Sequence, residues 1–353
     1  MTSAAAISLL QRLIATPSVS RGEGATAQII FDFLQEQGVA PKRHLNNVFS
    51  FCESYDSAKP ALLLCSHHDT VRPAAGCTRN PYAPDIEGGK LYGLGSNDAG
   101  ASVVSLIAAY CNFYTRQLPY NLVLAMVAEE EVQGPNGVES VIPLLGKIDC
   151  AVVGEPTQMQ AAVGERGLMV LDCTAYGRQG HAARSEGDNA LYRAVDDIAW
   201  FRTYKFPKKS ERMGEVKMTV TMMQCGTQHN VVPAECKFTV DVRPTDVYDN
   251  QEIVDIIRAN VKCGVQPRST RIRASSIADT HPLVTAAKKI GRTTYISPTT
   301  SDIALLKLPA LKMGPGDSAR SHSADEYVCV GEVEEAIKIY GELLEELVPL
   351  LSK

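Results

Sequence analysis

The spacing of apolar residues changes along the chain and predicts two kinds of sheet. Near-continuous apolar runs are typical of strands buried on both faces. They cover residues 61–65, 120–127 and 151–153. Helical spacing precedes and separates these runs, over residues 4–14, 23–37 and 99–114. Because strands that alternate with helices pair mostly in parallel, we expect a mainly parallel sheet flanked by helices.

The pattern differs after residue 164. Apolar and polar residues alternate over residues 167–177, 216–226 and 234–244. Such alternation is typical of antiparallel strands with one face exposed to water. Helical patterns at 189–201 and 251–262 and a last expected strand at 270–274 complete the region. The order strand, helix, strand, strand, helix, strand predicts a ferredoxin-like α+β module.

Helix–strand alternation resumes from Pro282 and ends in an amphipathic helix at 332–347. We therefore predict an α/β fold whose mainly parallel, mixed sheet is formed by residues 1–164 and 280–353. The ferredoxin-like module, residues 165–279, would be inserted into it as a lid and dimerisation domain. A length of 353 residues fits two domains.

Composition excludes several classes of function. The net charge is −5 and aromatic residues make up 6%, so we expect no nucleic-acid partner. The densest basic stretch, residues 202–212, is interpreted as a solvated loop. No apolar run approaches the length of a membrane span, and no cationic start precedes the apolar N-terminal stretch, so we expect no membrane partner and no secretory signal. The ten cysteines are scattered without a CxxC pair, which favours reduced thiols in a cytoplasmic protein.

Five potential metal ligands carry the candidate chemistry. They are His67, Asp98, Glu131, Glu155 and His322. The first four follow or abut predicted strands, whose C-terminal ends converge on one edge of such a sheet. Two imidazoles and three carboxylates suit a pair of zinc-like divalent ions. Each motif alone is a weak signal, since Asp98 could also serve as the N-cap of the helix that follows it.

Neighbouring residues extend this pattern. Asp69 lies two residues after His67, so its carboxylate can accept a hydrogen bond from the second ring nitrogen. Glu130 and Glu131 are adjacent and face different directions, so one can bind metal while the other moves a proton. We expect His68 to point away from His67. The chain has no Walker loop, GxSxG elbow or HExxH helix.

In order, and over nearly the whole chain, these motifs resemble those of the di-zinc aminoacylase and carboxypeptidase family, which includes acetylornithine deacetylase and succinyl-diaminopimelate desuccinylase. The matching segments are H-x-D at 67–69, the bridging Asp of YGLGSND at 98, E-E-x-x-G at 130–134, E-P-[ST] at 155–157, G-x-x-G-H-[AS] at 177–182, N-V-x-P at 230–233 and H-x-x-[DN]-E at 322–326. Departures at Ser66, Ala99 and Glu129 remove no ligand but leave the subfamily open.

The resemblance implies a role for each site residue. One ion would have the ligands His67, Asp98 and Glu155. The other would have the ligands Asp98, Glu131 and His322. Glu130 would act as general base and then as general acid, and Asp69 would support the first ion. His181 and Asn230 would contact the oxyanion or the substrate, and His181 often comes from the partner subunit.

The resemblance also places Arg166, Arg243 and Ser301 around the substrate. Arg166 could equally be a surface residue, and Arg243 could be an ordinary salt-bridge partner. We expect two Zn²⁺ ions, with Co²⁺ or Mn²⁺ as alternatives, and a homodimer formed through the inserted domain. A binding protein on a retired enzyme scaffold is a further alternative, which predicts that ligands or the base have been lost.

The expected reaction is hydrolysis of the amide of a small N-acylated amino acid. N-acetyl- or N-succinyl-ornithine or -citrulline, in arginine biosynthesis, is the preferred substrate. The alternatives are a succinyl-diaminopimelate desuccinylase of lysine biosynthesis and a metallo-dipeptidase or carboxypeptidase.

Overall fold

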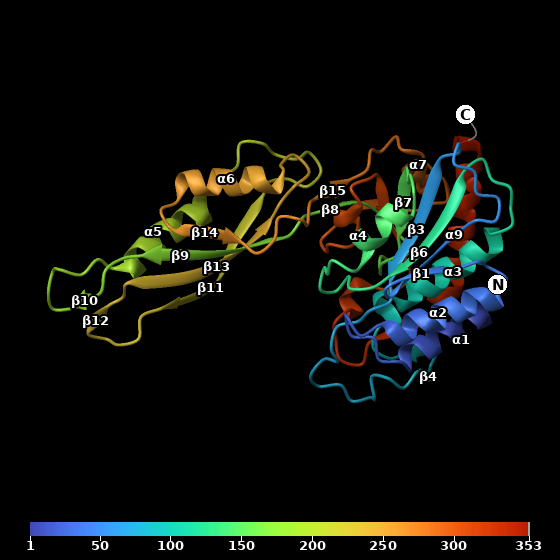
Figure 1. Cartoon of the computed structure of the whole chain (residues 1–353), viewed down its shortest axis with the longest axis horizontal. Coiled ribbons are helices and arrows are strands. Elements are labelled where there is room, and N and C mark those ends of the chain that lie inside the picture. The colour runs from blue at the N-terminus through green and yellow to red at the C-terminus, as the bar shows by residue number, and fades with distance from the viewer. Residues whose placement is uncertain (352–353) are drawn as a thin grey trace. The chain divides into compact units, whose positions relative to one another are not determined.

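The computed structural model describes residues 1–351, which form two compact units. Unit 1 contains Met1–Gly164, Ser276–Tyr295 and the described residues from Ser301 onward. Unit 2 contains Glu165–Ser275 and the short segment Ile296–Thr300. In Figure 1 the colour follows the residue number through both units.

The central sheet of unit 1 is mixed and is parallel in its middle. Its strand order is β1-β2-β6-β3-β7-β17-β8-β15, with β16 beside β8. The parallel strands are β6 (Asn121–Val127), β3 (Ala61–His67), β7 (Cys150–Val153) and β17 (Ala310–Lys312). The others are β1 (Lys42–His44), β2 (Asn47–Phe51), β8 (Ala161–Glu165), β15 (Ser275–Ser276) and β16 (Thr294–Ser297). Every residue of β3 and β6 is buried, as the continuous apolar runs predicted.

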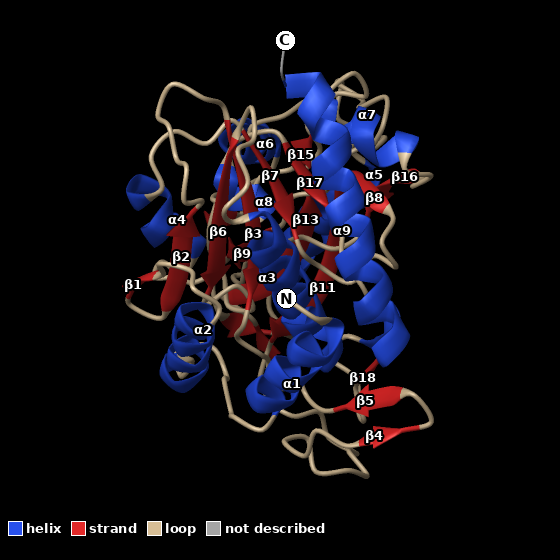
Figure 2. Ribbon diagram, turned by 90° about the vertical axis from the view of Figure 1, so that its right-hand side faces the viewer, coloured by secondary structure: helices blue, strands red, loops and turns tan. Residues whose placement is uncertain are grey.

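Helices cover this sheet (Figure 2). They are α1 (Ser3–Ile14), α2 (Gly24–Glu36), α3 (Ala101–Phe113), α4 (Val138–Val141), α7 (Pro282–Lys289), α8 (Ile303–Leu306) and α9 (Val330–Leu351). Short helical turns lie at Ser96–Gly100, Ile142–Leu144 and Ser318–Arg320. Helix α3 packs against β3 on one side and against α1 and α9 on the other, which explains why it is apolar and buried almost all round. A small antiparallel sheet joins β4 (Ile86–Glu87), β5 (Lys90–Tyr92) and β18 (Tyr327–Cys329).

Unit 2 is an antiparallel sheet with two helices. The sheet has the order β11-β13-β9-β14. In chain order its elements are β9 (Met169–Tyr176), α5 (Ala190–Thr203), β11 (Lys217–Cys225), β13 (Glu235–Arg243), α6 (Asn250–Asn260) and β14 (Gly264–Pro267). Alternate residues of β9 and β13 are buried and form an apolar core with both helices. This arrangement confirms the α/β fold with a ferredoxin-like module, and a pair of short strands, β10 (Gly180–His181) and β12 (Val231–Val232), is added to it.

The strand predicted at 270–274 is wrong. The last strand of the module is β14, which pairs with β9 from Gly264 to Pro267. Helix α6 ends at Asn260, so the chain reaches the edge of the sheet within a few residues. The segment 270–274 has no strand conformation, although Ile272 is buried. One buried apolar residue between polar neighbours was therefore mistaken for strand alternation.

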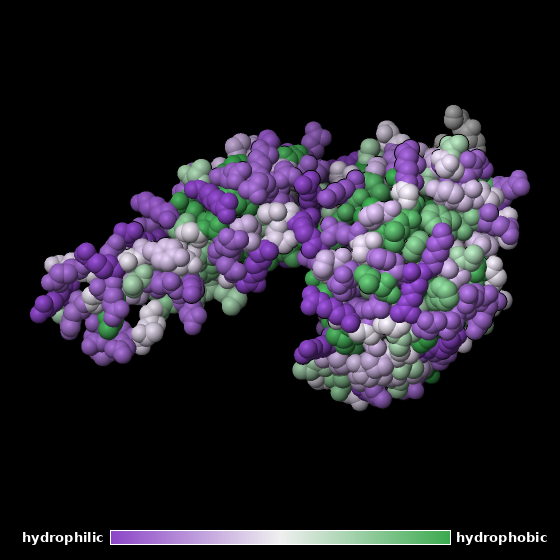
Figure 3. Space-filling view, in the orientation of Figure 1, coloured by the Kyte–Doolittle hydropathy of each residue, from purple (hydrophilic) through white to green (hydrophobic). Residues whose placement is uncertain are grey.

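Most of the surface visible in Figure 3 is hydrophilic in both units. Most large apolar side chains lie in the cores of the two units, although some, such as Tyr176, Tyr192 and Met222, are exposed. Among residues 1–351, no helix is both long enough and apolar enough to cross a membrane.

Candidate active site

The predicted ligands converge because three neighbouring parallel strands end at one edge of the central sheet. His67 is the last residue of β3, and Glu131 and Glu155 follow β6 and β7. Asp98 lies in the helical turn Ser96–Gly100, which precedes α3. The pairing of β18 with β5 brings the segment around His322 to the same place, although His322 lies 191 residues after Glu131 in the sequence.

Asp98 lies between two histidines. The Nε2 atom of His67 is 3.2 Å from Asp98 Oδ1 and 3.8 Å from Glu155 Oε1. The Nε2 atom of His322 is 3.6 Å from Asp98 Oδ2 and 3.0 Å from Glu131 Oε2. Each oxygen of Asp98 therefore faces a different histidine, which is the arrangement that a bridging carboxylate needs.

This donor set fits divalent metal. His67, Asp98 and Glu131 offer ligand atoms that all lie within 4.8 Å of one another, and this trio has members of both predicted ligand sets. Burial raises the pKa of Glu155 to about 8, because like charges and low polarity disfavour a carboxylate. Carboxylates crowded in this way keep their charge when cations lie among them. His and carboxylate ligands together suit zinc or a similar transition metal.

The orientation of His67 differs in one detail from the prediction. Its Nδ1 atom lies 3.0 Å from the backbone carbonyl of Asp69 and 3.5 Å from the carboxylate. The carbonyl is therefore the closer acceptor, and Nε2 remains directed toward Asp98. Burial opposes a charged imidazole, but the carboxylates of Asp69 and Asp98 outweigh it and raise the pKa of His67 well above its usual value.

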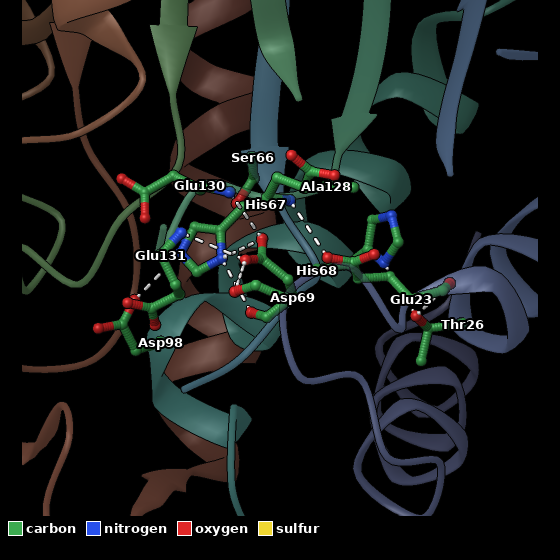
Figure 4. A network of polar contacts seen from close by, with 12 residues as sticks. Glu23, Thr26, Ser66, His67, His68, Asp69, Asp98, Ala128, Glu130 and Glu131 are labelled. Carbon is green, nitrogen blue, oxygen red and sulfur yellow. Dashed lines mark hydrogen bonds and ion pairs between the residues drawn. The ribbon is translucent and has the colours of Figure 1, made fainter. Parts of the chain in front are cut away.

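The carboxylate of Asp69 holds the strand-end segment that carries the glutamate pair (Figure 4). It accepts hydrogen bonds from the backbone N–H groups of Glu130 and Glu131 at 3.1 and 3.2 Å. Ser20 Oγ donates a third at 2.7 Å. Burial alone would raise the pKa of Asp69, but the neighbouring His67 ring and the hydrogen bond from Ser20 together outweigh burial and lower the pKa. Asp69 thus connects two ligand-bearing segments.

Glu130 and Glu131 have separate environments, as their adjacency predicted. Glu131 pairs with His322 and raises the pKa of this histidine to about 9. Among the described residues, no hydrogen bond is formed with the Glu130 carboxylate. Burial raises the pKa of Glu130 well above its usual value, and the nearby Glu155 carboxylate adds to the rise. Glu130 is thus suited to hold a proton beside the ligands.

Two further expectations at this site agree with the structure. His68 points away from His67, since its ring nitrogens contact Thr26 Oγ1 and the Asn46 carbonyl, each at 2.9 Å. Asp98 does not cap α3, because that helix begins at Ala101 without a side-chain cap. The structure therefore gives no support to a purely structural role for Asp98 as a helix cap.

In unit 2, the structure brings His181 and Asn230 together. His181 pairs with Val231 in the β10–β12 ladder, and Ala182 N donates to the Asn230 carbonyl at 3.0 Å. Both residues are exposed. His181 Nδ1 accepts a hydrogen bond from Ala183 N at 3.0 Å, so in the neutral ring the proton is on Nε2.

The other predicted substrate residues already have partners. The Arg166 guanidinium donates to the backbone carbonyls of Met213 and Glu215, and burial lowers its pKa. Arg243 forms a two-pronged ion pair with Asp241, with Nε–Oδ1 at 2.8 Å. Ser301 is buried, and its hydroxyl accepts from Ile303 N at 3.4 Å. For Arg243 the structure therefore favours the salt-bridge alternative.

Three residues without a predicted role are buried beside the predicted ligand segments: Glu326, Asn97 and Glu23. Glu326 accepts backbone N–H groups of the Asp98 loop. Glu23 accepts from Glu129 N at 3.3 Å. Glu326 and Asn97 carried a sequence signal, because Glu326 ends the motif that begins with His322 and Asn97 precedes Asp98 in YGLGSND, whereas Glu23 lies in no quoted motif.

Comparisons with known proteins identify the family of the chain. The model of peptidase family M20/M25/M40 matches residues 63–346. The chain is 25% identical to an acetylornithine deacetylase of Proteus mirabilis (strain HI4320), over 96% of both chains. It is 24% identical to a succinyl-diaminopimelate desuccinylase of Delftia acidovorans (strain DSM 14801 / SPH-1), over 97% of both.

A solved structure shares the fold. The Bacillus subtilis YXEP protein, described as a dinuclear metal binding peptidase of the M20 family, superposes with a TM-score of 0.75 at 16% identity and covers 98% of each chain. At this identity the likeness concerns the fold alone. The family model, in contrast, matches a range that spans most of the sequence. The chain therefore belongs to peptidase family M20/M25/M40, a family of metal-dependent hydrolases.

Proposed function

We propose that this chain is a dinuclear-metal amidohydrolase that removes the acyl group from an N-acylated amino acid. The position of Asp98 supports this most directly, since its two oxygens face His67 and His322 separately. One ion would be held by His67, Asp98 and Glu155, and the other by Asp98, Glu131 and His322. Zinc is the preferred metal for such ligands, and Co²⁺ or Mn²⁺ are alternatives.

Glu130 would move the proton in this reaction. Bound cations would lower the pKa of a water molecule and polarise the substrate carbonyl. Glu130 takes the proton of the attacking water and later returns it to the nitrogen of the leaving amine. Its carboxylate is free of hydrogen bonds within the described residues and lies beside Glu131, so the proton acceptor is next to the ligands without being one of them.

His181 would stabilise the oxyanion. Asn230 would either help to stabilise the oxyanion or contact the substrate. Its Nδ1 is occupied by Ala183 N, which leaves Nε2–H as a donor for developing negative charge. Both side chains are exposed in unit 2 and are thus available to a ligand. His181 would act within its own chain or across a homodimer formed through unit 2.

The preferred substrate is N-acetyl- or N-succinyl-ornithine or -citrulline, in the arginine biosynthesis of the cytoplasm. The similarity to an acetylornithine deacetylase supports it. Succinyl-diaminopimelate desuccinylase is the second candidate, because the chain is almost equally similar to such an enzyme. The guanidinium of Arg166, the group most suited to a second carboxylate, is bonded to backbone carbonyls, which favours acetyl over succinyl.

A substrate panel tests this proposal. We expect the highest kcat/KM for an acetylated or succinylated ornithine or citrulline among acetyl-ornithine, succinyl-ornithine, acetyl-citrulline, succinyl-citrulline and succinyl-diaminopimelate. A dipeptide control such as Ala-Ala distinguishes deacylase from peptidase. Metal content is measured on the same preparations. Protein with two bound ions that cleaves only dipeptides would refute the deacylase assignment, and protein that binds no metal would refute the dinuclear site itself.

A further inference from the structure

Glu326 joins the loop that carries Asp98 to the segment that carries His322. The Glu326 side chain is buried, with 4% of its surface exposed. One carboxylate oxygen accepts the backbone N–H groups of Asn97 and Asp98 at 2.8 and 2.9 Å. The other accepts the N–H of Gly95 at 3.0 Å. Three hydrogen bonds within four residues thus hold the backbone around a predicted ligand.

Asn97 joins the same two segments from the other side of His322. It is fully buried, and its Nδ2 donates to the Asp317 carbonyl at 3.1 Å and to Ser321 Oγ at 3.3 Å. Its Oδ1 accepts from Asp317 N at 3.0 Å. Asn97 bonds to Asp317 and Ser321, which precede His322 in the chain, and Glu326 follows His322. The segment is therefore held to the Asp98 loop on both sides of His322.

The segment needs such support because its backbone is not relaxed. His322 and Asp325 have φ angles of 57° and 55°, in the left-handed region that residues other than glycine rarely adopt. Tertiary contacts must offset the cost of such conformations. His322 is itself largely exposed, so packing around its ring does little to hold it. Apart from the contacts of its Nε2 with Glu131 and Asp98, the hydrogen bonds of neighbouring residues hold its backbone.

We infer, on the basis of the proposed dinuclear site, that Glu326 and Asn97 are positioning residues that set the distance between Asp98 and His322. The HSADE motif then has two functions. Its first residue, His322, is a proposed ligand, and its last residue, Glu326, supports a second proposed ligand, Asp98. Groups that orient metal ligands typically change metal affinity or activity 10- to 100-fold when they are replaced. The second ion, which needs Asp98 and His322 together, is the one affected.

Asp325 provides a matched control. Its carboxylate also accepts backbone N–H groups, from Thr78 and Arg79 at 2.9 and 3.0 Å. These bonds join the same strained segment to a mostly exposed loop that contributes none of the predicted ligands. Asp325→Asn therefore removes the same kind of interaction one residue away, without touching the Asp98 loop.

Zinc titration of the metal-free full-length chain tests the inference, with Zn²⁺ affinity measured by competition with a chromophoric chelator. Glu326→Gln places an amide N–H against the N–H of Gly95, and we expect the Kd of the weaker ion to rise roughly 10- to 100-fold. Asp325→Asn, which leaves the bonds to the Asp98 loop intact, should keep this Kd close to the wild-type value. With Co²⁺ as the probe, the visible absorption bands should shift in Glu326→Gln and stay unchanged in Asp325→Asn.

Circular dichroism shows whether each variant is folded. Asn97→Ala should also weaken binding of the same ion, and it tests the inference if Glu326→Gln does not fold. Folded Glu326→Gln or Asn97→Ala protein that binds two zinc ions with wild-type affinity would overturn the positioning role. A wild-type chain that binds fewer than two ions would instead contradict the proposed function, so the two failures are distinguishable.

Discussion

The two units differ in how they present most of their predicted functional residues, although His322 in unit 1 is exposed like His181 in unit 2. In unit 1, His67 and Asp69 are almost completely buried, and the backbone around Asp98, Glu130 and Glu131 is held by buried carboxylates. In unit 2, His181 and Asn230 lie exposed on short strands and loops. The predicted metal ligands of unit 1 must keep a fixed geometry before metal binds, because several charged side chains converge at that site. Residues that contact substrate need access, so exposure suits them.

Metal removal should have the largest effect, because the proposed reaction depends on the ions that unit 1 would hold. We expect hydrolysis to be abolished by a chelator and restored by Zn²⁺. Since ions bind the folded state, wild-type protein should also gain about 2.7 kcal/mol of stability at metal concentrations a hundredfold above Kd. Activity assays and thermal melting with and without metal measure both effects. Undiminished activity in protein shown to be metal-free would refute the metal mechanism.

Replacement of the proposed proton carrier should come next. Glu130→Gln should lower kcat by about 10²- to 10⁴-fold while both ions remain bound, since Glu130 is not a proposed ligand. Glu131→Gln is the matched variant. It should lose metal because Glu131, which lies 3.0 Å from His322 Nε2, is a proposed ligand of the second ion. Kinetics and metal analysis of the two variants separate the roles. If Glu130→Gln retains full activity, Glu130 does not move the proton.

In unit 2, His181→Ala should lower kcat by roughly a hundredfold, as the loss of one oxyanion donor does, with metal content unchanged. A mixture of His181→Ala and Glu130→Ala chains then tests whether sites are shared. Partial recovery of activity in a mixed dimer would show that His181 acts across the interface. No recovery in a confirmed mixed dimer would assign His181 to its own chain.

Arg243→Ala should have the smallest effect. Its guanidinium pairs with Asp241 on a partly exposed strand, and such pairs contribute less than about 1 kcal/mol. We expect a small fall in stability and little change in KM. Urea unfolding and steady-state kinetics provide the two values, with Asp241→Ala as the control for the lost pair. A large rise in KM for Arg243→Ala alone would restore Arg243 as a substrate residue.

Residue patterns predicted the features that depend on local sequence. The continuous apolar runs of β3 and β6 and the alternation of β9 and β13 were sufficient for the fold class, because burial on one or two faces leaves a direct trace in the sequence. The placement of His67 and Glu155 after strands was sufficient to predict that ligands would meet, because parallel strands end at one edge.

The tertiary structure alone decided which groups support those ligands. The Asp69 carboxylate bonds to the backbone of Glu130 and Glu131 rather than chiefly to the ring of His67. Glu326 holds the Asp98 backbone across 228 positions of sequence. The partner of a buried carboxylate is whichever N–H group the fold brings to it, and no spacing rule encodes a contact between segments so far apart.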